Sequence, residues 1–216
     1  MVNYTQVIKG LPIRPSKGFF GYSSVTLIKD GDVNILCDTG GYGVREAINE
    51  LKKTTKIDKV FITHLHFDHC ANIGLFKDTP IYIHEDELLE LRKKQEGLYS
   101  DMYTFIKDSL VGLNIIPFST EESLSKNTRI VFTPGHTIGH SSLEVINQDK
   151  KIIIAGDAIE TYQEYLNSNH FGDSFNVDKY QISRNLVKQY KIIIPGHSSI
   201  IEDGKLVDGS LELKFF

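Results

Sequence analysis

Thr63-His64-Leu65-His66-Phe67-Asp68-His69 is the stretch from which the fold and the chemistry of this chain can be inferred. In an extended or turning segment alternate side chains share a side, so His64 and His66 can bind the same cation. Asp68 and His69 enter the helix that follows and point to a position beside that cation. The spacing therefore predicts a metal site, with a second position next to the first.

Five apolar runs with the character of strands each end at a side chain that can bind a metal or accept a hydrogen bond. These side chains are Asp38 after NILC, His64 after KVFIT, His136 after TRIVFTPG, Asp157 after KIIIAG and His197 after KIIIPG. Groups at strand ends of α/β folds converge on a shared crevice, so we expect the five to meet at one site. Two metals need more ligands than the first stretch supplies, and His136, His197 and Asp157 would provide them. Asp157 is a natural bridge, because each carboxylate oxygen can hold one ion.

The donor set consists of imidazole and carboxylate groups, without thiolate. Such a set favours Zn²⁺, with Mn²⁺ and Fe²⁺ as alternatives, because imidazole suits several first-row ions. We therefore expect two divalent metal ions as cofactors, with Zn²⁺ first among the candidates.

The segments between these runs predict helices that can cover a sheet. GYSSVTLIK and DVNILC are β-rich and are joined by Asp30-Gly31, which is typical of a tight hairpin. Apolar residues at helical spacing predict an amphipathic helix over 44–53. Further helices are expected over 84–95, 99–111 and 177–189. Strands that alternate with helices favour a layered α/β domain.

The composition excludes several classes of protein. A hydrophobic fraction of 40% with 24% charged residues is ordinary for a globular enzyme and too apolar for a disordered tail. A formal net charge of -4 gives no basic surface for a phosphate backbone, so nucleic acid is a disfavoured partner. The chain has no apolar run long enough to span a bilayer and no signal-peptide pattern at its start. Cys37 and Cys70 lie in different motifs, so a reduced, cytoplasmic protein is the simpler expectation, with their pairing left open.

Five motifs in this order resemble those of the metallo-β-lactamase fold superfamily. They are DTG (38–40), THLHFDH (63–69), TPGHTIGHSS (133–142), AGD (155–157) and PGH (195–197). The resemblance implies a four-layer αββα sandwich, here as a single domain over 1–216. It also implies a dinuclear site, with His64, His66 and His136 on one metal, Asp68, His69 and His197 on the other, and Asp157 as the bridging ligand.

Asp157 also indicates the branch of the superfamily. Zinc β-lactamases commonly have a cysteine at this position, so antibiotic hydrolysis is not the expected activity. Asp157 resembles the thioesterase (glyoxalase II), lactonase and phosphodiesterase branches, and His66 differs from the glutamate of the diiron oxygen-reducing branch. The stretch AGDxxE (155–160) is similar to the metallo-β-lactamase domain-containing protein 1-like subgroup. The helical C-terminal domain with which glyoxalase II grips glutathione is expected to be absent.

The expected activity is hydrolysis of a small-molecule ester, thioester or lactone by a hydroxide that bridges two metals. Asp68 is the predicted catalytic residue, which passes the proton onward. Two alternatives stay open: a phosphodiesterase or ribonuclease with the same dinuclear site, and a mononuclear iron persulfide dioxygenase. The sequence leaves the oligomeric state open.

Several side chains around the ligands have predicted supporting roles. Asp38 is expected to orient a ligand histidine, with a turn cap as the alternative. His140 is either a hydrogen-bonding partner of the site or a packed core histidine. The aromatic loop 159–175 provides the candidate substrate contacts Glu160, Tyr162 and Tyr165. Cys70, His84 and His170 are expected to play no part in the site.

Overall fold

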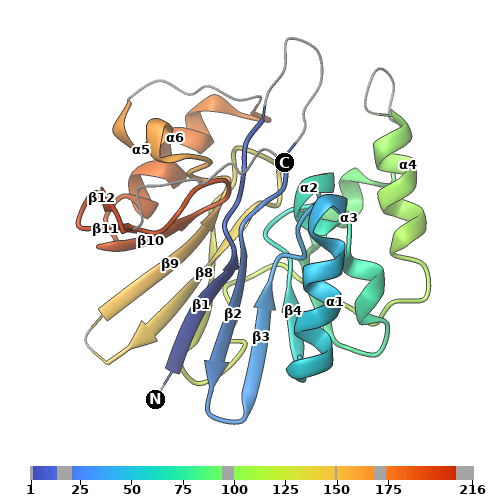
Figure 1. Ribbon diagram of the computed structural model, residues 1–216. Coiled ribbons are helices and arrows are strands. Elements are labelled where there is room, and N and C mark those ends of the chain that lie inside the picture. The colour runs from blue at the N-terminus through green and yellow to red at the C-terminus, as the bar shows by residue number, and fades with distance from the viewer. Residues whose placement is uncertain (1, 14–20, 94–99, 149, 168–173, 208–216) are drawn as a thin grey trace, which may run out of the picture.

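Two six-stranded sheets face each other in the computed structural model, which describes residues 2–13, 21–93, 100–148, 150–167 and 174–207 (Figure 1). The first sheet has the order β1-β2-β3-β4-β5-β6 and the second β12-β11-β10-β9-β8-β7. The strands of the first sheet are β1 (Val2–Ile8), β2 (Val25–Asp30), β3 (Val33–Cys37), β4 (Lys59–Phe61), β5 (Ile81–His84) and β6 (Ile115–Phe118). Those of the second are β7 (Thr128–Phe132), β8 (Ser141–Asn147), β9 (Lys150–Gly156), β10 (Ile192–Pro195), β11 (Ile201–Glu202) and β12 (Lys205–Leu206).

Helices cover the outer face of each sheet (Figure 1). The first sheet is covered by α1 (Arg45–Thr54), α2 (Phe67–Cys70), α3 (Glu85–Glu90) and α4 (Ser100–Ser109), with short 3₁₀ turns η1 (Tyr42–Val44) and η2 (Ile73–Phe76). The second sheet is covered by α5 (Tyr162–Leu166) and α6 (Val177–Val187). Helix, sheet, sheet and helix form the four layers that the resemblance implies, and the expected fold is confirmed.

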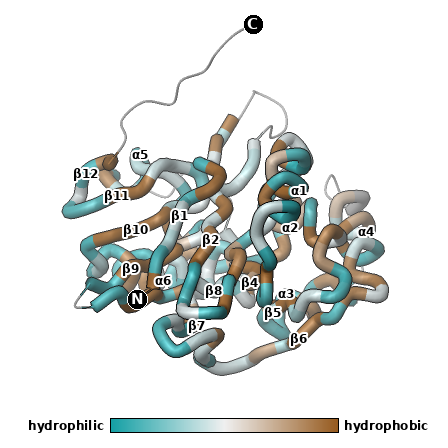
Figure 2. The backbone as a smooth tube through the Cα atoms, turned by 60° about the horizontal axis from the view of Figure 1, so that its bottom comes forward, coloured by the Kyte–Doolittle hydropathy of each residue, from teal (hydrophilic) through white to brown (hydrophobic). Residues whose placement is uncertain are grey.

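Three hydrophobic layers separate the four layers of secondary structure. Ile152, Ile154 and Ile192 belong to the cluster between the two sheets, whereas Ile153 and Ile193 belong to the cluster beneath α5 and α6. Successive residues of a strand point to opposite faces, so the runs of consecutive isoleucines in β9 and β10 are apolar on both faces (Figure 2). Burial of each such side chain contributes about 1.5–3 kcal/mol.

Most of the predicted elements are present, with two corrections. The hairpin turns at Gly31, which has a φ of 62°, and pairs Asp30 with Val33. The helix expected over 84–95 is wrong in its extent: α3 ends at Glu90, because Arg92 and Lys93 donate to carbonyls three residues back in a tightened turn. The region 159–175 is also not entirely a loop, since α5 lies within it, begun by the Thr161 side chain that accepts from the Glu164 amide.

The strands that precede the candidate ligands end at the same edge of the sandwich. Strands β3 and β4 are parallel neighbours in one sheet, and β9 and β10 are parallel neighbours in the other. Strand β7 also runs parallel to β9, because both pair antiparallel with β8. None of the helices in the described parts of the chain is long and apolar enough to cross a membrane.

Candidate metal centre

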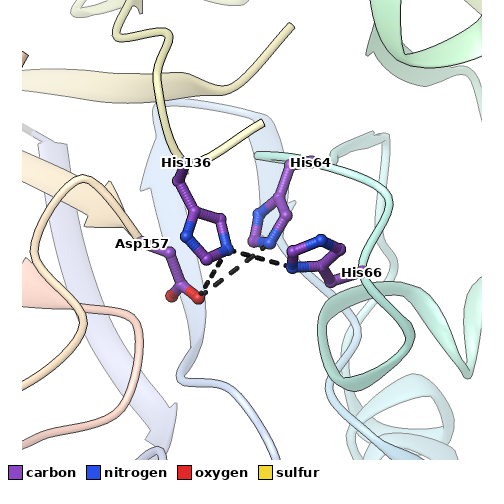
Figure 3. Close-up of side chains that lie close together, drawn as sticks. All are labelled: His64, His66, His136 and Asp157. Atoms are coloured by element: carbon purple, nitrogen blue, oxygen red, sulfur yellow. Dashed lines mark hydrogen bonds and ion pairs between the residues drawn. The ribbon is translucent and has the colours of Figure 1, made fainter. Parts of the chain in front are cut away.

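Four of the predicted ligands form a first group at this edge, which consists of His64, His66, His136 and Asp157 (Figure 3). The Nε2 atom of His136 lies 2.9 Å from His66 Nδ1 and 3.3 Å from Asp157 Oδ2. His64 Nε2 lies 4.0 Å from the same carboxylate oxygen. One donor atom from each of the four residues lies within 4.8 Å of the others, so a single ion can contact all four.

The remaining three predicted ligands, Asp68, His69 and His197, form a second group. His197 Nε2 lies 3.2 Å from Asp68 Oδ2, and His69 Nε2 lies 3.9 Å from that atom. Asp157 lies between the groups, because its Oδ1 is 3.2 Å from His69 Nε2 and its Oδ2 is 3.6 Å from His197 Nε2. The structure thus brings together all seven candidate ligands, with one carboxylate in contact with both groups.

Glycines allow the chain to approach this carboxylate closely. A Cβ atom on Gly196 would lie 1.8 Å from Asp157 Oδ1, so only glycine leaves room for the acid. Gly156 has a φ of 53°, and a Cβ there would lie 2.8 Å from His140 Nε2. The glycines of the AGD and PGH motifs are therefore required by the packing around Asp157.

Each of four candidate ligand histidines has a second ring nitrogen, turned away from the groups, that meets an oxygen atom. Nδ1 of His69 lies 2.8 Å from Asp38 Oδ2, and Nδ1 of His197 lies 3.1 Å from the Tyr22 carbonyl oxygen. Nδ1 of His64 lies 3.1 Å from Thr63 Oγ1, and Nδ1 of His136 lies 3.6 Å from Glu160 Oε1. The partners of His69, His197 and His64 lie at hydrogen-bond distance, and such partners hold the ring orientation of metal-binding histidines and direct Nε2 toward the ion. The 3.6 Å between His136 Nδ1 and Glu160 Oε1 is longer than a hydrogen bond.

Asp38 makes the contact that its predicted orienting role requires. Its buried carboxylate faces His69 and also accepts hydrogen bonds from the Thr63 backbone N–H (2.8 Å) and hydroxyl group. The residue has a φ of 59°, in the left-handed region that aspartate and asparagine tolerate better than most residues. Thr63, for which the sequence analysis predicted no role, joins Asp38 to the loop that carries the first two histidines.

His140 contacts the backbone of Asp157 rather than an open part of the site. Its Nε2 accepts a hydrogen bond from the Asp157 N–H (3.0 Å), and its Nδ1 lies 2.9 Å from the Thr133 carbonyl oxygen. These partners require a neutral ring with the proton on Nδ1. Burial lowers the pKa of His140 to about 4, which agrees with that form. Of the two roles considered for His140, these contacts favour the hydrogen-bonding one.

Buried donor atoms at the centre fit a cation. His64 Nε2 is buried without a hydrogen-bond partner among the described residues, whereas His69 Nε2 and Asp157 Oδ1 are buried and lie 3.2 Å from each other. Burial, followed by the charges of His69 and His66, holds the pKa of His64 well below its ordinary value, so its ring is neutral with a free lone pair. An unpaired buried acceptor such as His64 Nε2 carries a desolvation cost that a bound ion would remove. The residues present therefore fit a divalent metal ion.

The second group differs from the first in charge. Although burial opposes it, the carboxylates of Asp157, Asp38 and Asp68 raise the pKa of His69 well above its ordinary value. Asp157 likewise raises the pKa of His197 to about 10, against the effect of burial. The carboxylates thus stabilise positive charge in the second group, and either protons or metal ions can supply that charge.

The three candidate substrate contacts lie in different surroundings. Glu160 is buried beside His136 Nδ1, and its carbonyl oxygen accepts from the His197 N–H (2.6 Å). Tyr162 and Tyr165 stack on each other and pack against the hydrophobic cluster of the second sheet, and the Tyr162 hydroxyl donates to the Gly204 carbonyl oxygen. Glu160 thus contacts candidate ligands, and the substrate contacts of all three stay predictions.

The two cysteines and His84 belong to neither group of candidate ligands. Cys37 and Cys70 are free, buried thiols whose pKa values burial raises well above the ordinary range. His84 is buried, and its Nδ1 accepts from the Asp86 N–H at the start of α3. His170 lies outside the described residues.

Removal of bound metal should lower the melting temperature, because the buried donors then lose their charge partner. A ligand present at 100 times its Kd raises the free energy of unfolding by about 2.7 kcal/mol. For a chain of this length, that change corresponds to a shift in melting temperature of about 5–10 °C. Thermal unfolding monitored by circular dichroism, before and after chelation, measures the shift. Addition of Zn²⁺ should restore the original melting temperature. Equal melting temperatures before chelation, after chelation and after addition of Zn²⁺ would contradict the assignment of these residues to a metal site.

Comparison with known proteins agrees with this geometry. A family model for the metallo-beta-lactamase superfamily matches residues 18–197. A protein of Methanocaldococcus jannaschii named "probable metallo-hydrolase" is 32% identical over 200 residues, which cover 84% of this chain and 90% of that protein. An N-acyl homoserine lactonase of Bacillus cereus is 23% identical over 151 residues, which cover 67% of this chain and 57% of the lactonase. The crystal structure of a quorum-quenching N-acyl homoserine lactone lactonase shares the fold, with a TM-score of 0.68, 21% identity and coverage of 91% of both chains.

Proposed function

We propose a two-metal mechanism for this chain, which belongs to the metallo-beta-lactamase superfamily and is a metal-dependent hydrolase. In this proposal, two divalent ions serve to hydrolyse the acyl C–O or C–S bond of a small ester, thioester or lactone. One observation carries the proposal: seven buried or half-buried histidines and aspartates lie in two groups that share Asp157. The similarity to N-acyl homoserine lactonases supports a carbonyl substrate.

His64, His66 and His136 would hold one ion and Asp68, His69 and His197 the other, with Asp157 in contact with both. Zn²⁺ suits this donor set best, and Mn²⁺ and Fe²⁺ are the alternatives. Two such ions, when bound, lower the pKa of water and polarise a carbonyl oxygen. The protein supplies the orientation: Asp38, Thr63 and the Tyr22 carbonyl group hold the rings of His69, His64 and His197, and His140 holds the backbone of Asp157.

Asp68 is proposed to move a proton between the reacting group and solvent. Its side chain is 13% exposed, compared with 5% for Asp157 and 3% for Asp38, so it is the carboxylate of the three with most access to water. Burial alone would raise its pKa, but the His69 charge and the hydrogen bond from His197 lower the pKa of Asp68 to about 2. The carboxylate is therefore ionised at neutral pH.

Asp68→Asn should keep most of the bound metal and lose turnover. The amide oxygen can still face the second group, but the side chain no longer accepts and releases a proton, which is expected to lower kcat by about 10²- to 10⁴-fold. Metal content by mass spectrometry and steady-state kinetics measure the two effects separately. Asp78→Asn removes an exposed carboxylate and is the matched control. A kcat equal to that of the control would reject the role of Asp68.

The proposed function is tested by metal analysis together with a substrate panel. Protein purified without added metal is analysed by mass spectrometry and assayed on a thioester, a lactone and a bis-aryl phosphodiester. Two metal equivalents and turnover of a carbonyl substrate support the proposal. Preference for the phosphodiester would favour a phosphodiesterase or ribonuclease. One iron per chain, with oxygen uptake on glutathione persulfide, would favour a dioxygenase.

We further propose a small-molecule substrate and a cytoplasmic location. The free, buried thiols of Cys37 and Cys70 support a reducing compartment. The formal net charge of -4 supports a partner other than nucleic acid.

A further inference from the structure

A buried glutamate outside the two groups contacts both loops that carry the first group of histidines. Glu87 lies in α3 and is 5% exposed. Its Oε2 atom accepts a hydrogen bond from the Leu65 backbone N–H at 2.8 Å, and its Oε1 atom accepts one from the Gly139 backbone N–H at 2.9 Å. The two oxygens of one carboxylate thus bind two segments that are far apart in the sequence.

The positions of these two amides relate them to the candidate ligands. Leu65 lies between His64 and His66, and Gly139 lies in the loop that runs from His136 to His140. Every histidine of the first group therefore lies on a loop whose backbone donates to Glu87. The relative placement of the loops determines whether the three rings can face the same ion.

Close packing keeps Glu87 in contact with the loop 136–140. A Cβ atom on Gly139 would lie 2.9 Å from both Cγ and the backbone nitrogen of Glu87, so the loop can approach only with glycine at this position. Helix α3 is held in turn by His84, which accepts from the Asp86 N–H and stacks on Phe132 with ring centroids 4.7 Å apart. The Glu87 carboxylate therefore lies on a helical turn whose position is fixed by these contacts.

Burial of a carboxylate is costly unless its oxygens are hydrogen-bonded, and here each oxygen has a backbone donor. A leucine at this position would remove the desolvation cost but would leave two buried N–H groups without their present acceptor. Charge-assisted bonds to backbone N–H groups are short and directional, which suits the placement of loops.

We propose that Glu87 is a positioning residue of the metal centre, which sets the separation of the loops 63–66 and 136–140 and so preorganises His64, His66 and His136 for one ion. The inference rests on the proposed two-metal function. It adds a residue that touches neither ion nor substrate and acts through the backbone of the ligand loops.

Glu87→Gln tests this role because it preserves size and removes one of two acceptors. The amide NH₂ group must then face a backbone N–H, so one of the two loops loses its partner. We expect the affinity for one of two Zn²⁺ equivalents to fall about 10- to 100-fold, with kcat lowered more than KM is raised. The visible absorption spectrum of the Co²⁺-loaded protein should change, because the histidines no longer surround the ion in the same way.

Glu85→Gln is the matched control, since it removes the same charge from an exposed side chain of the same helix. Zn²⁺ affinity is measured by competition with a chromophoric chelator at 10 °C, on samples whose circular dichroism is that of the wild type. Weaker binding in Glu87→Gln but not in Glu85→Gln supports the proposal. Wild-type affinity and an unchanged Co²⁺ spectrum in Glu87→Gln would overturn it, whether or not the melting temperature falls.

If Glu87→Gln does not fold, Glu87→Asp tests the positioning role of Glu87 in its place. It keeps the charge and both acceptor oxygens on a stem one methylene shorter, which cannot reach both loops, so we expect weakened binding of one Zn²⁺ equivalent. Wild-type binding by a folded Glu87→Asp protein would overturn the proposal. Failure of the wild type to bind two equivalents would instead contradict the proposed function, so the two failures are distinguishable.

Discussion

Replacement of Asp157 by asparagine is expected to lower kcat/KM by more than about 100-fold and to reduce the bound metal from two equivalents to one or fewer. Loss of a partner that merely orients a ligand costs about 10- to 100-fold, and Asp157 contacts both groups directly. Its Oδ1 lies 3.2 Å from His69 Nε2 and its Oδ2 lies 3.3 Å from His136 Nε2. An asparagine offers one oxygen and turns an NH₂ group toward the other histidine, where a donor cannot replace a ligand.

Mass spectrometry of the bound metal and kinetics on the substrate found in the panel measure this effect. Asp32→Asn, which alters an exposed aspartate in the β2–β3 hairpin, controls for a general effect of charge removal. Circular dichroism of the metal-free proteins shows whether both variants are folded. Two retained equivalents and near-normal kinetics in Asp157→Asn would contradict the shared role of this carboxylate.

Asp38→Ala is expected to lower the free energy of unfolding by about 3–5 kcal/mol and the affinity for one metal equivalent by about 10- to 100-fold. The substitution leaves the Thr63 N–H and hydroxyl group and His69 Nδ1 without the carboxylate they contact. Buried groups that lose a hydrogen-bond partner cost about 1–3 kcal/mol each. Alanine at a φ of 59° adds strain, because the Cβ atom disfavours the left-handed region. Denaturant unfolding and chelator competition measure the two effects.

Asp38→Asn separates the backbone effect from the orienting effect. Asparagine tolerates a positive φ, and its oxygen can still accept from Thr63, so we expect a loss of stability below about 2 kcal/mol. Its NH₂ group would then face His69 Nδ1, which favours the ring form with the proton on Nε2 and no lone pair toward the metal. We therefore expect weakened metal binding in a stable protein. Wild-type affinity in Asp38→Asn would contradict the orienting role.

The strands and the main helices were predictable because their signals are local. The consecutive isoleucines of 152–154 and 192–194 indicated strands, and the structure places both strands between helices and the opposite sheet. Apolar residues at helical spacing predicted α1, and a helix was also expected where α6 lies. The end of α3 was not predictable from the continuing pattern, since helix ends commonly tighten into a 3₁₀ turn without a change in the sequence pattern.

The sequence by itself determined the fold class and the seven candidate ligands, because strand ends and motif spacing are properties of neighbouring residues. Tertiary structure alone decided the pairings: Asp38 with His69, His140 with the backbone of Asp157, and Glu87 with the backbone of both ligand loops. The segment 84–95 is rich in charged residues, as exposed helices are, so nothing in it indicates that Glu87 is buried. Such contacts join residues far apart in the chain, and they depend on sheet register and layer packing, which no local pattern specifies.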